Sequence, residues 1–139
     1  MVRVEWNEVS YEPSVGPDGS YLYQGKPFTG IRYGLYPNGG LECEEEYRHG
    51  LQWGLSRGWY RSGTIRHEAT LYQGGLHGTC REWHQNGQLA LEQVGEYGIL
   101  LSEKKWDEQG QLVSEYAIEE GGGDWRTLQL CRKQNGNVE

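Results

Sequence analysis

The sequence has few aliphatic side chains and no long hydrophobic run. Hydrophobic residues make up 35% of the chain, which has a single Met and a single Phe. No stretch approaches the roughly 18 consecutive apolar residues that suggest a membrane-spanning helix. The first eight residues, Met-Val-Arg-Val-Glu-Trp-Asn-Glu, contain no apolar segment of the kind found in secretory signals. We therefore expect no membrane span, no classical export signal and a cytoplasmic location.

Cysteine and basic residues are also scarce. Cys43, Cys80 and Cys131 are widely spaced and form no Cys-x-x-Cys pair, which argues against a zinc site or a disulfide framework and fits a reducing compartment. Thirteen Lys and Arg against twenty Asp and Glu give a formal net charge of −7. This balance disfavours binding to nucleic acid or anionic lipid and favours a basic protein partner, although many soluble proteins are simply acidic.

Glycine, in contrast, is abundant and periodic. Gly30, Gly54 and Gly78 are 24 residues apart, as are Gly39, Gly63 and Gly87, with Gly110 following at 23. The same register holds for other residue types: Leu41, Ile65, Leu89 and Leu112; Glu44, Glu68, Glu92 and Glu115; and Leu35, Trp59, Trp83 and Trp106. A period of this length indicates stacked supersecondary units. Such arrays present a long surface, which favours a macromolecular partner.

Each unit contains a hairpin signal, at Asn38-Gly39, Ser62-Gly63, Asn86-Gly87 and Gln109-Gly110. We predict two-residue type I′ turns centred on these pairs. When residues are counted outward from each turn centre, Arg57 is predicted to lie opposite Glu68 and Arg81 opposite Glu92. The same count predicts the pairs Lys104 with Glu115, Tyr33 with Glu44, Tyr36 with Leu41, Tyr60 with Ile65, His84 with Leu89 and Asp107 with Leu112. Opposite charges then meet directly in three hairpins, which supports the register. The alternative, a three-residue loop with a glycine bulge, shifts the pairing by one residue and weakens this match.

The predicted register sorts the side chains onto two faces. One face carries Leu35, Trp59, Trp83, Trp106 and the rows of charged residues. The other carries Tyr36, Leu41, Cys43, Tyr47, Tyr60, Ile65, Ala69, Leu71, Leu89 and Leu91. Like rows recur on every second strand, about 10 Å apart.

The ends of the chain lack the repeat. We expect one domain, with repeats over about 18–116 (a partial first unit over 18–30), an N-terminal cap over 1–17 with a strand near Val2–Val9, and a C-terminal cap over 117–139. In the C-terminal cap, Asp124 could cap a short helix to about Lys133, or Thr127–Arg132 could form a last strand. Either element would cover the open end of the sheet. The predicted fold is all-β: a single-layer, twisted antiparallel meander of about four hairpin repeats.

The units Tyr-Pro-Asn-Gly-Gly-Leu-Glu (36–42), Tyr-Arg-Ser-Gly-Thr-Ile-Arg (60–66) and His-Gln-Asn-Gly-Gln-Leu-Ala (84–90) are each followed by Glu two residues later, and Gly-x-x-x-Gly segments span 50–54 and 74–78. This pattern resembles the variant class of MORN repeats found in bacterial antitoxins of the YwqK type. The resemblance covers about residues 18–116 and implies a single-layer β-meander. It also implies an immunity protein encoded beside a polymorphic toxin, with no catalytic motif.

The residues themselves show no catalytic arrangement. The four histidines His49, His67, His77 and His84 have no ligand spacing, and His67-Glu68 lacks the second histidine of a zinc-binding helix. Cys80 with His77 or His84 would be an accidental nucleophile–base pair. No phosphate-binding glycine motif occurs. We expect neither catalysis, nor a metal, nor a cofactor.

The hypothesis that remains is protein binding. Glu42, Glu44 and Glu46 alternate onto one face, either as a solvated edge or as an acidic patch for a basic partner. Tryptophan, tyrosine and arginine dominate protein interfaces. We place the partner-binding surface at Glu42, Glu44, Glu46, Arg57, Trp59, Arg66, Arg81 and Trp83. The predicted partner is the effector domain of a cognate secreted toxin, bound by a monomer in a 1:1 complex; the alternative is a non-enzymatic scaffold that recruits another cellular protein.

Overall fold

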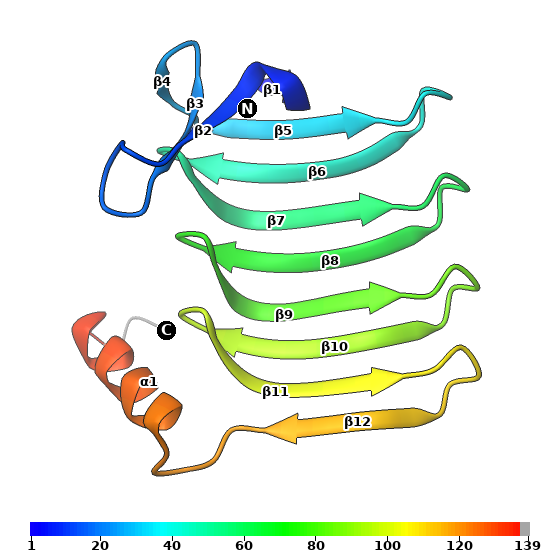
Figure 1. Cartoon of the computed structure of the whole chain (residues 1–139), viewed down its shortest axis with the longest axis vertical. Coiled ribbons are helices and arrows are strands. Elements are labelled where there is room, and N and C mark those ends of the chain that lie inside the picture. The colour runs from blue at the N-terminus through cyan, green and yellow to red at the C-terminus, as the bar shows by residue number, and fades with distance from the viewer. Residues whose placement is uncertain (137–139) are drawn as a thin grey trace.

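The computed structural model describes residues 1–136 and shows an open, single-layer β-meander (Figure 1). The last three residues of the expected C-terminal cap, 137–139, lie outside the described part. The elements are β1 (Arg3–Glu5), η1 (Trp6–Glu8), β2 (Val9–Glu12), β3 (Ser20–Tyr23), β4 (Lys26–Pro27), β5 (Gly30–Leu35), β6 (Leu41–Arg48), β7 (Leu51–Trp59), β8 (Ile65–Tyr72), β9 (Gly75–Trp83), β10 (Leu89–Glu96), β11 (Ile99–Trp106), β12 (Leu112–Ala117) and α1 (Gly123–Gln134).

Strands β5 to β12 pair antiparallel with their sequence neighbours, so the predicted all-β repeat fold is confirmed. The N-terminal part is more elaborate than expected. The expected strand over Val2–Val9 is divided into β1, the short helix η1 and the start of β2. β1 pairs parallel with β5, and β2, β3 and β4 form a separate three-stranded sheet. The prediction of one purely antiparallel sheet was therefore wrong at this end.

The two ends of each hairpin use different turns, and the predicted turn type was wrong. In the loop after β7, the amide of Gly63 donates to the carbonyl of Tyr60, and the amide of Tyr60 donates to the carbonyl of Thr64. Gly63 has φ +93° whereas Ser62 is not in the left-handed region, as in a three-residue loop with a glycine bulge. The same bonds recur at Tyr36, His84 and Asp107.

The type I′ turns lie instead at the opposite ends of the strands. The dipeptides Gln24-Gly25, His49-Gly50, Gln73-Gly74 and Tyr97-Gly98 have φ between 50° and 53° at the first residue and between 79° and 86° at the second. Each joins strands whose flanking residues pair directly, as Arg48 does with Leu51. Two positive φ angles in a two-residue loop are the signature of this turn.

A bulge next to each three-residue loop restores the predicted ion-pair register. In the β7–β8 hairpin, Trp59 pairs with Ile65, whereas Gly58 pairs with His67, so that Arg66 is an extra residue. Glu42, Ala90 and Val113 are the corresponding extra residues in the other hairpins. The predicted pairs of Tyr36 with Leu41, Tyr60 with Ile65, His84 with Leu89 and Asp107 with Leu112 were therefore wrong. Arg57 with Glu68, Arg81 with Glu92, Lys104 with Glu115 and Tyr33 with Glu44 are confirmed.

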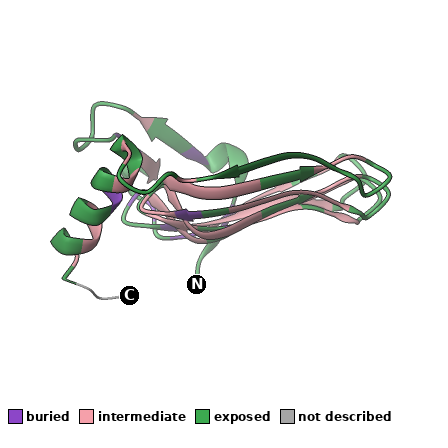
Figure 2. Ribbon diagram, turned by 90° about the horizontal axis from the view of Figure 1, so that it is seen from below, coloured by how far each residue is buried: buried purple, intermediate pink, exposed green. Residues whose placement is uncertain are grey.

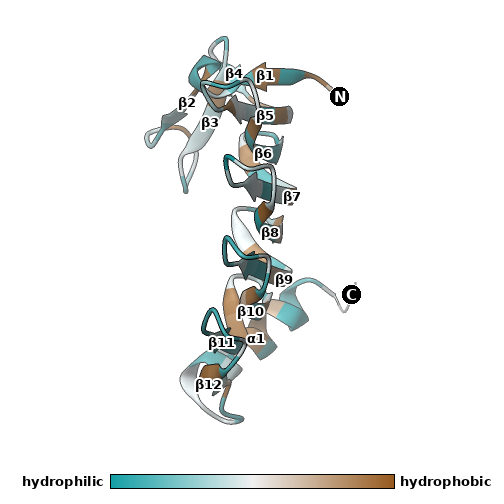
Figure 3. Ribbon diagram, turned by 90° about the vertical axis from the view of Figure 1, so that its right-hand side faces the viewer, coloured by the Kyte–Doolittle hydropathy of each residue, from teal (hydrophilic) through white to brown (hydrophobic). Residues whose placement is uncertain are grey.

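Within residues 1–136, a second layer covers the large sheet at its N-terminal end and beside the type I′ turns. The buried cluster of Val4, Val9, Phe28 and Tyr47 lies where the small sheet packs on the large one. Along the rest of the sheet most strand residues are half-buried, as expected of a single layer with solvent on both faces (Figure 2). Seen from the side, β5 to β12 follow one another in single file (Figure 3).

The C-terminal segment forms the predicted helix, although its start and its position differ from the prediction. Gly122 occupies the N-cap, so Asp124 lies in the first turn and does not cap the helix. Leu128 is fully buried, and Arg132 donates to both oxygens of Glu96 at 2.7 and 2.8 Å. α1 therefore packs at the type I′ end of the strands (Figure 1). It leaves all six residues of β12 exposed, contrary to the expectation that the C-terminal cap would cover this edge.

Candidate functional site

An apolar stripe crosses one face of the sheet near the three-residue loops. It consists of one cross-strand pair from each hairpin: Leu35–Leu41, Trp59–Ile65, Trp83–Leu89 and Trp106–Leu112. We call this set the tryptophan stripe and the face that carries it the tryptophan face. Directly opposed residues share a face, so Leu41, Ile65 and Leu89 were predicted on the wrong face. Leu35 and Leu112, at the two ends, are 48% and 50% exposed.

The loops join neighbouring repeats at the level of this stripe. The Tyr36 hydroxyl donates to the carbonyl of Trp59 at 2.5 Å, and the Tyr60 hydroxyl donates to that of Trp83 at 2.6 Å. The His84 ring makes the corresponding bond to the carbonyl of Trp106 at 2.9 Å. In the last loop, the Asp107 carboxylate instead accepts hydrogen bonds from the backbone amides of Gln109 and Gln111 in the same loop. Each tryptophan is therefore held in place by the preceding repeat.

A row of charges of alternating sign runs beside the tryptophan stripe. Across consecutive strands its members are Glu44, Arg57, Glu68, Arg81, Glu92, Lys104 and Glu115, each in direct register with the next. Within the hairpins, Arg57 lies 2.9 Å from Glu68, Arg81 lies 3.0 Å from Glu92 and Lys104 lies 3.7 Å from Glu115. Glu44 is paired with Arg3. The row is therefore electrically balanced along its length.

We expect these ion pairs to contribute little to stability. The Arg57 and Glu68 side chains are 40% and 34% exposed, so water screens their attraction. A double-mutant cycle with Arg57→Met and Glu68→Gln, measured by urea unfolding, should give a coupling energy of about 0.2–1 kcal/mol. A coupling of zero would show that the pair does not support the register.

The structure divides the predicted partner-binding residues between the two faces. Glu44, Glu46, Arg57, Trp59, Arg81 and Trp83 lie on the tryptophan face. Neither the N-terminal segment nor α1 covers the stripe there, since both pack elsewhere on the molecule. Glu42 and Arg66 are the extra residues of two bulges, and both lie toward the opposite face. A Cβ on Gly58 would be 3.2 Å from an Arg66 Nη and 2.5 Å from the His67 ring.

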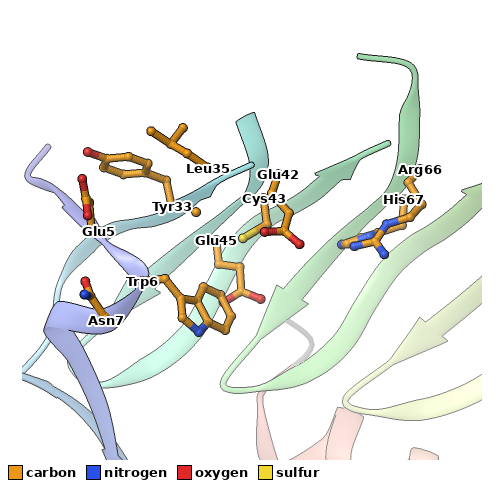
Figure 4. Close-up of a pocket in the computed structure, with 11 residues that line it drawn as sticks. Glu5, Trp6, Asn7, Tyr33, Leu35, Glu42, Cys43, Glu45, Arg66 and His67 are labelled. Atoms are coloured by element: carbon orange, nitrogen blue, oxygen red, sulfur yellow. The ribbon is translucent and has the colours of Figure 1, made fainter. Parts of the chain in front are cut away.

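That opposite face, which we call the cysteine face, has an open cavity of about 620 Å³ between η1 and the strands β5, β6 and β8 (Figure 4). Gly34 forms part of its floor: a Cβ there would lie 3.2 Å from the Cys43 sulfur and 3.9 Å from the Trp6 Cβ. Side chains of both charge signs line it, namely Glu5, Glu42, Glu45 and Arg66. Sequence reasoning did not find this cavity, because Trp6 precedes the repeats and has no periodic counterpart.

Arg32 holds the N-terminal segment over the cavity. Only 8% of this residue is exposed, and its guanidinium lies 3.4 Å from the centre of the Trp6 ring. The guanidinium donates to the carbonyls of Trp6 and Val9 at 3.1 and 3.4 Å and to the Tyr47 hydroxyl at 3.3 Å. The Tyr47 hydroxyl in turn donates to Glu45 at 2.6 Å. Burial, together with the neighbouring Glu45, raises the pKa of Tyr47, which keeps this phenol protonated.

The titratable groups of the cysteine face are not tuned for nucleophilic chemistry. Burial and the Glu45 carboxylate raise the pKa of the Cys43 thiol, whereas burial and Arg66 lower the pKa of His67. Burial and Glu82 likewise raise the pKa of Cys80. An activated cysteine requires the opposite shift, toward the thiolate. His77 and His84, considered as bases for Cys80, are hydrogen-bonded to the Tyr97 amide and the Trp106 carbonyl.

Residues 1–136 contain no cluster of His, Cys, Asp or Glu with the arrangement of a metal site. In the same range, no helix has the length and apolar character needed to cross a bilayer. The structure thus presents two features suited to binding, the tryptophan stripe and the cavity of the cysteine face.

Comparison with known proteins agrees with this architecture. The MORN repeat variant family matches residues 76–94, which span the loop between β9 and β10 and much of both strands. The chain is also similar to the protein named "Immunity protein YwqK" from Bacillus subtilis (strain 168). The two are 54% identical over 114 residues, which cover 82% of this chain and 74% of the Bacillus protein. No solved structure matches the chain.

Proposed function

The chain belongs to the MORN-repeat variant family together with the immunity protein YwqK, and from this premise we propose that it is itself an immunity protein. It binds the effector domain of a cognate secreted toxin and occludes the active site or the substrate surface of that domain. We further propose that it acts in the cytoplasm as a monomer, in a 1:1 complex, without nucleic acid or membrane. The observation that carries the proposal is the uncovered tryptophan stripe, because aromatic residues beside charged ones are the usual anchors of a protein interface.

The tryptophan face is the better candidate for the contact. It combines Trp59 and Trp83 with Arg57 and Arg81, four residues of the types enriched at binding hot spots. The Tyr36 and Tyr60 bonds hold the tryptophan backbones before any partner arrives, which lowers the entropic cost of binding. The net charge of −7 favours the approach of a basic toxin surface.

Substitutions on the two faces test this proposal. We expect Trp59→Ala to weaken toxin binding about 30-fold, mainly through faster dissociation, because it removes a central apolar anchor. Glu46→Lys, on the same face, should slow association and reduce its dependence on salt. Arg66→Ala, on the cysteine face, is the matched control and should leave the Kd unchanged. Binding rates can be measured by surface plasmon resonance against the purified effector domain of the proposed cognate toxin.

The assay in cells uses the same variants. Cells that carry the toxin should lose protection with Trp59→Ala and keep it with Arg66→Ala. Loss of binding with Arg66→Ala alone would assign the contact to the cysteine face. Failure of the wild-type protein to bind the neighbouring gene product would favour the scaffold role instead.

A further inference from the structure

The tryptophan stripe has a spacing that matches one particular ligand conformation. Trp59, Trp83 and Trp106 lie at equivalent positions of successive hairpins, two strands apart, which corresponds to about 9.6 Å at ~4.8 Å per strand. A polyproline II helix advances about 9.3 Å per three-residue turn. The difference is about 0.3 Å per repeat, so every turn of such a helix can meet an equivalent tryptophan.

Other regular segments fit this spacing less well. An α-helix advances about 10.5 Å per heptad and would be out of step by roughly 2.7 Å after three repeats. An extended strand covers the same distance in three residues, but successive contact residues would then point to opposite sides. We propose that the tryptophan stripe binds a proline-containing segment in the polyproline II conformation, with one turn of the segment on each repeat. We place this segment on the toxin, and that part of the inference rests on the proposed function.

The hydrogen-bonding groups of the stripe suit such a ligand. Within residues 1–136, no hydrogen bond is assigned to the indole N–H of Trp59, Trp83 or Trp106, and no buried side-chain nitrogen or oxygen lacks a partner. The indole N–H groups of these half-buried side chains are therefore not fully buried, and they have no partner among the described residues. A polyproline II segment has no internal hydrogen bonds, so its carbonyls are free to accept. Proline-rich segments dock in aromatic-lined grooves by this combination of ring packing and donated bonds.

The charged residues beside the tryptophan stripe are paired with one another, which favours an uncharged segment as the ligand. Arg57, Arg81 and Lys104 each lie within 3.7 Å of a carboxylate of the same hairpin, and Arg3 pairs with Glu44, so the charges of the row are balanced once Arg3 is included. Glu42 and Arg66 do not belong to this row of charges, and their side chains lie toward the cysteine face. A neutral apolar ligand therefore meets no unpaired charge along the track, and a strongly charged one gains little there.

Decaproline, about 31 Å long, is the probe that tests the proposal without the toxin. Titration followed by tryptophan fluorescence should show saturable binding, and tetraproline, which covers one turn, should bind at least tenfold more weakly. Trp83→Ala should weaken decaproline binding at least tenfold. Trp83→Leu, which keeps an apolar side chain, should retain the fold and lose the indole donor, with a smaller but measurable loss of affinity.

Trp53→Ala is the matched control. Trp53 lies on the same strand as Trp59 but toward its other end. The centre of its ring lies 4.7 Å from that of Tyr72 and 4.8 Å from the guanidinium carbon of Arg48. Removal of the Trp53 side chain should therefore not change the affinity for decaproline. Absence of decaproline binding, equal effects of Trp53→Ala and Trp83→Ala, or preferential binding of an amphipathic heptad peptide would each overturn the proposal. If the toxin binds but decaproline does not, the proline track is refuted and the immunity function stands. If decaproline binds but the toxin does not, the immunity function is refuted and the binding of a polyproline II segment to the tryptophan stripe stands.

Discussion

Replacement of Arg32 by methionine should lower the free energy of unfolding by about 3 kcal/mol. Arg32 is only 8% exposed, and it joins the N-terminal segment to the sheet through the Trp6 and Val9 carbonyls, the Tyr47 hydroxyl and the Trp6 ring. Methionine keeps much of the apolar volume but leaves these acceptors without their donor in a poorly hydrated site. The measurement is urea unfolding monitored by circular dichroism.

Arg57→Met is the control for this prediction, because it removes the same charge from a strand of the same sheet. Arg57 is about 40% exposed, so its loss should cost less than about 1 kcal/mol. Equal losses for the two variants would mean that Arg32 does not anchor the N-terminal segment. Limited proteolysis adds a second readout, since only Arg32→Met should make the segment before β5 more susceptible to cleavage.

Substitution of Gly50 by alanine should be similarly costly, also about 3 kcal/mol. Gly50 has φ +83°, and an added Cβ would lie 1.9 Å from the Ser20 hydroxyl and 3.3 Å from Pro27. Its amide donates to the Phe28 carbonyl at 2.8 Å and its carbonyl accepts from the Tyr21 amide at 2.9 Å, so the turn has little freedom to move away. Backbone strain and overpacking therefore add together.

Gly74→Ala separates these two contributions. Gly74 occupies the same position in the next type I′ turn, with φ +86°, and an added Cβ would meet nothing within 4 Å. Only the strain of a left-handed alanine remains, at about 1–2 kcal/mol. If thermal unfolding showed the same loss for both variants, the docking of the small sheet on the Gly50 turn would be wrong.

The repeat period and the ion pairs were predictable from the sequence, whereas the turn type was not. Asn-Gly is compatible both with a type I′ turn and with a three-residue loop whose glycine forms a bulge. The charge match of Arg57 with Glu68 could not distinguish the two, because the longer loop shifts the register by one residue and the bulge at Arg66 shifts it back. The two departures from the predicted hairpin thus cancel at Arg57 and Glu68, the pair that supported the predicted register.

The same bulge explains why the candidate site was predicted only in part. Strict alternation from Glu44 puts Glu42 on the tryptophan face, and strict alternation from Glu68 does the same for Arg66. An extra residue in each strand reverses both placements, and it also moves Ile65 and its equivalents into the stripe. Bulges leave no dependable mark in a single sequence, since any residue that tolerates the local twist can occupy them.

The N-terminal region was the least predictable part of the fold. Trp6 and Arg32 are 26 residues apart and belong to no common repeat, so nothing in the spacing indicates their contact. β1 pairs parallel with β5, and the short helix η1 between β1 and β2 carries Trp6 to the Arg32 side chain. Local propensity alone carries no information on such long-range pairing.

The bulge at Val113 also has a consequence for the behaviour of the protein at high concentration. An exposed, regularly alternating edge strand invites a second molecule to extend the sheet, and repeated addition of this kind produces fibrils. In β12 the alternation is broken at Val113, so that only residues 114–117 remain regular, fewer than the five or six residues of an ordinary strand. Glu115 lies within this short stretch and would bring like charges together between stacked edges. The short regular stretch and its carboxylate thus make pairing of a second strand with this edge less favourable.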